Sequence, residues 1–139
     1  MSDGGVTSRP LPRTDGPERP FWEGLLAGEV RVQRCICGHY RFPAARYCGV
    51  CHSPQHAWVR VEQYGVVESF CVFHKRYFAG LEVPYAVVQV RLQCGVRFFA
   101  NMLDVAIDDI RIGMPVTAAF EQATSDVTLL QFRAREIAA

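Results

Sequence analysis

Alternating apolar and polar residues predict strands over most of the second half of the chain. Turn-forming residues separate these segments, most clearly Gly65, Gly95 and Gly113-Met114-Pro115. Five or six strands within about eighty residues are typical of a small Greek-key barrel of the OB type, and a β-sandwich is the alternative. The predicted strands are 58–63, 66–74, 85–94, 96–103, 116–122 and 128–135.

A short helix is predicted just before residue 28. Its apolar face consists of Phe21, Trp22, Leu25 and Leu26, which recur at i, i+1, i+4 and i+5. Pro20 suits a first helical turn, and Gly28 suits the exit. A helix this short is not stable alone, so it must pack on its own domain or on a partner. The alternating segment 29–34 then predicts a strand that leads into a group of cysteines.

The first nineteen residues contain several glycines and prolines and few large apolar residues. This composition predicts a flexible arm. The chain is therefore mainly β and divides into an arm at 1–19, a helix with a cysteine-bearing segment at 20–56, and a barrel at 57–139.

Two closely spaced cysteine pairs, Cys35-Ile36-Cys37 and Cys48-Gly49-Val50-Cys51, predict a zinc ribbon. Four thiolates can close a tetrahedral site, although Cys-x-Cys is tighter than the usual Cys-x2-Cys spacing. The alternatives are four free or disulfide-bonded cysteines, or a site in which His39 or His52 replaces one thiol. We expect Cys35, Cys37, Cys48 and Cys51 to hold a structural Zn²⁺.

The composition of the whole chain limits the classes of function. Half of its 139 residues are hydrophobic, which is enough for a core. Its 15 basic and 14 acidic residues give a net charge of +1, so no overall field attracts a polyanion. No apolar run approaches the roughly 18 residues that span a bilayer, and the N-terminus has no apolar signal core. We expect a cytoplasmic protein, in which reduced thiols favour metal binding over disulfides.

The chain lacks the common catalytic motifs: the Ser nucleophile elbow, the phosphate-binding loop and the paired-His metalloprotease helix. The aspartates at 104–109 are typical of a solvated turn. Cys71 and Cys94 fall within apolar strands and are expected to be buried thiols. A stand-alone enzyme that uses Cys71 or His74 therefore has little support.

A basic and aromatic segment follows the second predicted barrel strand. It consists of His74, Lys75, Arg76, Tyr77 and Phe78. Such side chains can contact a phosphate or an adenine ring, and an exposed polar loop is the alternative.

A nucleic-acid-binding module is a different class of function that also uses zinc ribbons and OB folds. Aromatic side chains available to stack bases are Tyr64, Phe70, Phe73, Phe98 and Phe99. The balanced charge argues against this class, because such sites usually carry a basic stripe.

Several short motifs follow one another in a specific order between residues 20 and 136. They are Phe21-Trp22-Glu23-Gly24, Arg31-Val32-Gln33-Arg34-Cys35, Arg41-Phe42-Pro43-Ala44-Ala45-Arg46-Tyr47-Cys48 with Cys51, Gly65-Val66-Val67-Glu68-Ser69-Phe70, His74, Val83-Pro84-Tyr85-Ala86-Val87-Val88, Gly95-Val96-Arg97 with Asn101, and Ile112-Gly113-Met114-Pro115-Val116. This series resembles a bacterial and archaeal family of acyl-CoA-associated proteins that join a rubredoxin-like zinc ribbon to an OB fold. The chain departs from the family in having one residue, not two, between its first two cysteines.

The resemblance implies a non-catalytic accessory subunit. Proteins of this family look like partners of thiolase-superfamily enzymes, either thiolases or thiolase-like aldolases of lipid or steroid side-chain degradation, in a hetero-oligomer. It also implies that the ribbon and the leading helix dock on the partner, and that the OB barrel lies near the CoA thioester. Carried over by position, the docking residues are Phe21, Trp22, Leu25, Phe42 and Pro43, and the residues near acyl-CoA are His74, Lys75, Arg76, Tyr77 and Phe78.

Overall fold

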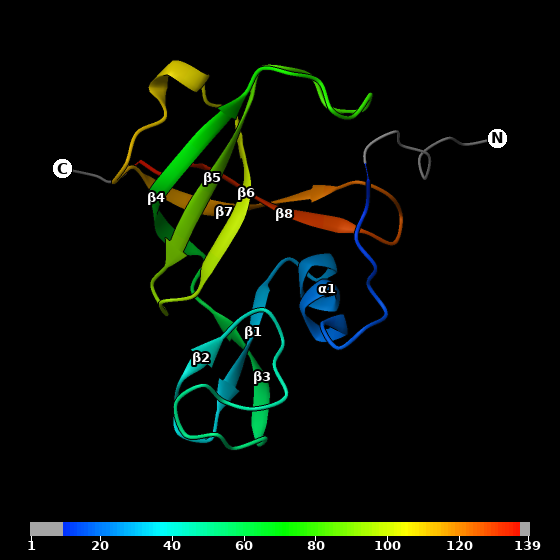
Figure 1. Ribbon diagram of the computed structural model, residues 1–139, viewed down its shortest axis with the longest axis vertical. Coiled ribbons are helices and arrows are strands. Elements are labelled where there is room, and N and C mark those ends of the chain that lie inside the picture. Colours follow the sequence, from blue (N-terminus) through cyan, green and yellow to red (C-terminus); the bar gives the residue numbers. More distant parts are fainter. Residues whose placement is uncertain (1–9, 137–139) are drawn as a thin grey trace.

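The computed structural model describes residues 10–136, so residues 1–9 of the predicted arm lie outside the described residues. A helix and a small sheet lie beside a β-barrel (Figure 1). In chain order the elements are α1 (Arg19–Leu26), β1 (Val30–Cys35), β2 (Tyr40–Arg41), β3 (His56–Val61), β4 (Tyr64–Phe73), β5 (Tyr85–Leu92), β6 (Arg97–Leu103), the 3-10 helix η1 (Ile107–Asp109), β7 (Pro115–Gln122) and β8 (Thr128–Ala134).

The predicted helix is confirmed as α1, which carries proline in its first turn. The chain leaves the helix at Gly28, whose φ of +80° lies in the left-handed region that favours glycine. Gly24 faces β1 so closely that a Cβ there would lie 2.8 Å from Cγ of Arg31. The helix therefore packs directly on the sheet, as a helix of this length must.

The small sheet has the strand order β2-β1-β3, with antiparallel pairing throughout. We predicted that the strand near residue 58 belongs to the barrel, but β3 lies in this sheet. Its pairing with β1 runs from Val30↔Val61 to Cys35↔His56, which leaves the whole strand committed to the ribbon. The chain passes from the ribbon into the barrel at residues 62–63.

The second sheet closes into a barrel in the order β4-β5-β6-β8-β7, so the predicted OB-type barrel is confirmed and the sandwich is not. Closure depends on a short parallel pairing of β6 with β8, Met102↔Phe132 and Leu103↔Arg133. Next to this pairing, a side chain takes the place of a backbone acceptor. Asn101 N of β6 donates to Oε1 of buried Gln131 of β8 at 2.7 Å. Backbone pairing of β6 with β8 is thus confined to the ends of the two strands, and the Asn101–Gln131 hydrogen bond joins them beside it.

One hydrophobic core joins the ribbon and the barrel. Val30 and Val32 of β1 belong to the same buried cluster as Val88, Val90 and other barrel residues. Within residues 10–136, no helix has the length and apolar character needed to span a membrane.

Candidate metal centre and docking groove

The four predicted metal ligands come together at the end of the ribbon. The Sγ atoms of Cys35, Cys37, Cys48 and Cys51 all lie within 4.8 Å of one another. The Cys37–Cys48 Sγ distance is 3.8 Å, and the Cys35–Cys51 distance is 3.2 Å. Tetrahedral zinc with Zn–S bonds of about 2.3 Å places its sulfur atoms about 3.8 Å apart. The four thiols could therefore bind one metal ion with only small changes in the positions of their sulfur atoms.

Two tight turns aim these thiols at one point. Gly38 N donates to Cys35 O at 2.8 Å, and His52 N donates to Cys48 O at 3.0 Å. Both turns end in the left-handed region, with φ +95° at Gly38 and +63° at His52. The single residue between Cys35 and Cys37 thus still permits a closed turn. His39 and His52 lie outside the group of ligand atoms, so the alternative with a histidine ligand has no support from the geometry.

Backbone N–H groups point at the sulfur atoms and favour thiolates. Hydrogen bonds from Cys51 N and Val50 N lower the pKa of Cys48 to about 6, although burial opposes the shift. The Cys37 backbone N–H similarly lowers the pKa of Cys35. At Cys51 a backbone hydrogen bond with Ser53 lowers the pKa, but Cys35, burial and the other two thiols together raise it to about 12. Hydrogen bonds among the thiols and burial thus raise the pKa of Cys51, whereas backbone N–H groups lower those of Cys48 and Cys35.

All six cysteines lie in the described part of the chain and are free thiols. A four-sulfur tetrahedral donor set suits zinc or iron rather than a hard cation such as Mg²⁺. Two of the four ligands, Cys35 and Cys48, are buried, and Cys37 and Cys51 are exposed. The centre can therefore hold such an ion near the surface, where it stabilises the two turns.

A buried polar network holds the segment that follows β2. Oε1 of Gln33 accepts from Arg41 Nε at 2.8 Å and from Ala45 N at 2.9 Å. Arg41 also donates to Ala45 O at 3.1 Å, and Glu18, the N-cap residue of α1, accepts from Ala44 N at 3.3 Å. These bonds fix the loop that carries Phe42 and Pro43 against the helix.

An apolar groove of about 730 Å³ lies beside the parts of β6 and β8 that precede their paired residues. It brings together four of the predicted docking residues: Phe21 and Trp22 of α1, and Phe42 and Pro43 of the loop after β2. Sequence reasoning missed the barrel side of the groove, which includes Phe99 of β6 and Leu129 and Leu130 of β8. Phe99 is 72% exposed between buried Phe98 and Ala100. The sequence signal that could have indicated this side of the groove is an apolar residue at a position where strand alternation predicts an exposed polar one.

Two of the predicted docking residues, Phe21 and Leu25, are largely buried. Phe21 is only 4% exposed and Leu25 only 1%, because both pack into the core that joins helix, ribbon and barrel. Phe21 thus borders the groove from within the core, whereas Leu25 does not line it, and the docking role of both stays a prediction.

The expectation that Cys71 is buried is also wrong. Its strand, β4, has an irregularity between Val67 and Ser69 that shifts the register by one residue. Side chains beyond such a bulge point to the opposite face, so Cys71 is exposed although Val67 is buried. Cys94 is half-buried, and burial raises the pKa of its thiol.

The segment predicted to lie near acyl-CoA is an exposed loop between β4 and β5 that projects from the barrel (Figure 1). Within it Lys75 Nζ lies 5.2 Å from the centre of the Tyr77 ring, and Arg76 pairs with Glu82 at 3.3 Å. Phe78 is 45% exposed. The loop is at the surface, as one prediction had it, and carries both basic and aromatic side chains.

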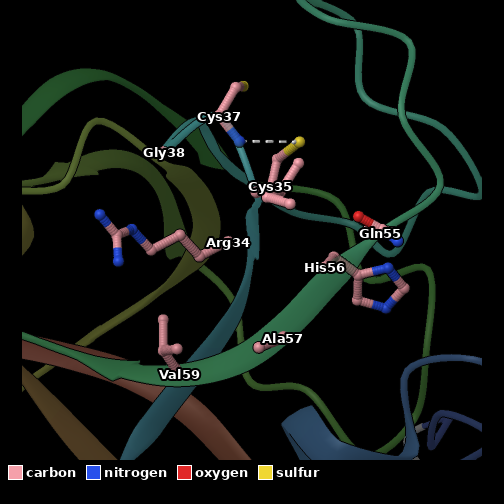
Figure 2. A pocket seen from close by; sticks show the side chains of 9 residues that line it. Arg34, Cys35, Cys37, Gly38, Gln55, His56, Ala57 and Val59 are labelled. Atoms are coloured by element: carbon pink, nitrogen blue, oxygen red, sulfur yellow. Dashed lines mark hydrogen bonds between the residues drawn. The ribbon is translucent and has the colours of Figure 1, made fainter.

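A second hollow, of about 460 Å³, lies on the side of the ribbon next to the metal centre (Figure 2). Arg34 borders it from β1, Ile36 and Cys37 from the first cysteine turn, and Ala57 and Val59 from β3. Its lining is therefore mixed, with one arginine, polar Gln55 and His56, and apolar side chains beside the thiols of Cys35 and Cys37.

The fold and the cysteine site define a class of protein, in which a four-cysteine ribbon precedes a closed five-stranded OB barrel. A family model described as "ChsH2, C-terminal OB-fold domain" matches residues 58–121. A solved chain described as "Ltp2-ChsH2(DUF35) aldolase" has a TM-score of 0.81 and 32% identity, and the match covers 91% of this chain and 98% of that one. The chain thus belongs to the DUF35 family of ChsH2-like proteins, which confirms the resemblance seen in the sequence.

Two curated relatives are hydratase subunits. The "Probable enoyl-CoA hydratase alpha subunit" of Thermomonospora curvata is 32% identical over 126 residues, which are 90% of this chain and 40% of that protein. The "3-oxo-4,17-pregnadiene-20-carboxyl-CoA hydratase alpha subunit" of Mycobacterium tuberculosis is 33% identical over 72% of this chain and 32% of its own length. The chain therefore spans about a third to two fifths of these relatives. A DUF35 protein of unknown function from Sulfolobus solfataricus shares the fold alone, with a TM-score of 0.60 and 16% identity over 87% of each chain.

Proposed function

We propose that this chain is a non-catalytic accessory subunit that docks on a thiolase-superfamily enzyme, stabilises it and helps to position an acyl-CoA substrate in a catabolic pathway. The observation that carries the proposal is the match to the aldolase-associated chain, because 32% identity over nearly its full length includes both ribbon and barrel. The CoA thioesters in the names of the two hydratase relatives support the same substrate class.

The four-cysteine centre has a structural role in this proposal. It holds Zn²⁺, the usual ion for four thiolates at closed tetrahedral sites. No position is left open for a substrate in such a site. The ion therefore fixes the end of the ribbon and takes no part in chemistry.

The partner docks at the apolar groove. Trp22, Phe42 and Phe99 present aromatic surface around it, and aromatic side chains dominate the energy of protein interfaces. The groove is built on rigid elements: α1 is packed on β1, and hydrogen bonds of Gln33 and Arg41 fix the loop after β2. A surface held in one conformation loses little entropy on binding.

The exposed loop after β4 approaches the acyl-CoA at the entrance of the partner's active site. Lys75 supplies a cation for a phosphate, and Tyr77 and Phe78 supply ring surface for the adenine or the acyl group. The guanidinium of Arg76 is shared with Glu82, so a phosphate would compete with this carboxylate.

Titration of this chain into purified thiolase-superfamily subunits from the same cells tests the proposal. We expect one of them to bind in a fixed ratio and to gain activity or stability with an acyl-CoA substrate. Phe99→Ser should weaken binding, whereas Ile112→Ser should not, because Ile112 is 69% exposed on the barrel but outside the groove. Enzyme subunits that are fully stable and active alone, with unchanged substrate affinity, would contradict the proposal.

A further inference from the structure

Lys75 is the one lysine of the sequence. Of the 15 basic residues of the chain, this one is a lysine and the rest are arginines. A guanidinium stays protonated in proteins and is not a nucleophile, whereas an ammonium can lose a proton and become a nucleophilic amine. The side-chain amine chemistry of the chain is therefore concentrated at one position, in the loop between β4 and β5.

A row of aromatic rings holds this amine against the barrel. Nζ of Lys75 lies 5.2 Å from the centre of the Tyr77 ring. The Tyr77 ring meets Phe73, the last residue of β4, edge-on with the ring centroids 6.5 Å apart. Phe73 in turn stacks on Tyr85, the first residue of β5, at a centroid distance of 5.1 Å. The position of the amine is thus linked through these rings to the ends of two barrel strands.

The amine is accessible and has no carboxylate partner. Every residue from His74 to Gly80 is exposed. None of the ion pairs formed between residues 10 and 136 includes Lys75, whereas the neighbouring Arg76 pairs with Glu82 at 3.3 Å. Because no carboxylate covers Nζ, a ligand that approaches the loop can reach it directly.

We propose that Lys75 is an acylation site, at which the acyl-CoA held by the complex transfers its acyl group to Nζ. The proposal rests on the proposed function, because in that function this loop approaches the thioester. A thioester held beside the loop reacts as if it were present at a much higher concentration than in solution.

The acyl transfer needs no oxidant and no further reactant. The lone pair of the neutral amine attacks the thioester carbonyl carbon, so a C–N bond forms and the C–S bond breaks. The sulfur leaves with the bonding electron pair as the CoA thiolate, and the proton lost by the nitrogen passes through water to this sulfur. The products are an Nε-acyl-lysine and free CoA. The amide is neutral, so the loop loses its lysine cation.

A second lysine, before the opposite end of β4, provides the matched control. Arg60→Lys introduces an exposed amine on β3, where Arg60 forms no ion pair with any residue between 10 and 136. The ten residues of β4 rise by about 3.3 Å each, so roughly 30 Å of strand separates the two positions (Figure 1). Both amines then belong to one molecule and meet the same bulk concentration of acyl-CoA.

The Arg60→Lys chain, assembled with its enzyme partner, is incubated with butyryl-CoA, and acylation of each lysine is followed by mass spectrometry of the digested chain. Hydroxylamine treatment before digestion removes acyl groups from thiols, including exposed Cys71, and leaves amides intact. We expect Lys75 in the complex to gain the butyryl group at least about tenfold faster than the lysine introduced at position 60. In the isolated chain the ratio of the two rates should fall towards one. Lys75→Arg, which keeps the charge, should remove the amide from the loop.

Equal rates at the two lysines in an assembled complex would overturn this inference and leave the proposed function intact. Acyl groups confined to hydroxylamine-sensitive thiols would overturn it in the same way. Failure of the chain to assemble with any thiolase-superfamily subunit would overturn both.

Discussion

Phe21 of the helix stacks on Phe98 of the barrel, with ring centroids 5.8 Å apart and ring planes at 14°. Phe42 of the ribbon contacts both rings: its ring centroid lies 4.5 Å from that of Phe21 and 4.9 Å from that of Phe98. Three parts of the chain therefore meet in one aromatic cluster. This cluster fixes the ribbon relative to the barrel and forms the floor on which the docking groove lies.

Replacing Phe98 with alanine should lower the free energy of unfolding by about 3–5 kcal/mol, because a ring that is 6% exposed leaves a cavity among its neighbours. Urea unfolding measures the change. Phe99→Ala is the matched control, since the adjacent ring is 72% exposed, and it should change stability by no more than about 0.5 kcal/mol. Equal losses in the two variants would contradict the role of the cluster.

Cys48→Ser should remove the metal and destabilise the ribbon, because this thiol is buried and its pKa of about 6 makes it a thiolate near neutral pH. Elemental analysis of the purified protein should find one zinc per wild-type chain and much less in the variant. Cys71→Ser, at an exposed cysteine outside the cluster, should keep the metal. Wild-type metal content in Cys48→Ser would contradict the assignment.

Trp22→Ala should weaken binding of the enzyme partner by about 2 kcal/mol or more, because a partly buried tryptophan that lines the groove is a typical interface anchor. Isothermal titration measures this change, and urea unfolding checks that the isolated chain remains folded. Trp22→Phe retains a ring and should lose less. An unchanged Kd in Trp22→Ala would mean that this ring serves internal packing only.

Arg76→Ala should raise the apparent KM of the assembled complex for the CoA ester. Assembly of the complex should remain unchanged. Glu82→Ala frees the guanidinium from its 3.3 Å ion pair and should not raise that constant. Steady-state kinetics of the complex separates the two variants. If both leave the constant unchanged, the loop does not contact the substrate.

Glu68 predicts a specific pH dependence of stability. Its carboxylate accepts from Arg97 Nε at 2.6 Å and from Arg91 Nε at 3.0 Å, and the hydrogen bond from Arg97, followed by its charge and by Arg91, lowers the pKa of Glu68. Because the folded pKa lies below the unfolded value of about 4.3, the stabilisation is present above that pH and is lost as pH falls through the folded pKa. Wild-type Tm should therefore fall more than that of Glu68→Gln as acid is added. Parallel Tm curves would contradict this coupling.

The cysteine centre was predictable from sequence because its four ligands lie in two short turns, and both turns belong to one segment of seventeen residues, Cys35 to Cys51. Strand alternation also predicted the barrel strands well. The assignment of β3 to the ribbon was not predictable, because alternation reports a strand but not its neighbour. The exposure of Cys71 depends on a bulge in β4, and no pattern in the sequence predicted that bulge.

The docking groove shows a similar limit. Trp22, Phe42 and Pro43 were found through the family resemblance, but their contact with Phe99 and Leu130 depends on where β6 and β8 stop pairing. The residue pattern of the helix predicted an apolar face. It did not predict whether the chain's own core or a partner protein covers that face. Phe21 and Leu25 turned out to face the core.

Affinity purification of this chain from its native cells, with retained proteins identified by mass spectrometry and quantified against the bait, tests the central claim most directly. The account predicts a thiolase-superfamily subunit in a fixed ratio to the chain, with one zinc per copy in the same sample. Recovery of the chain with nucleic acid, or without any thiolase-superfamily subunit, would contradict it.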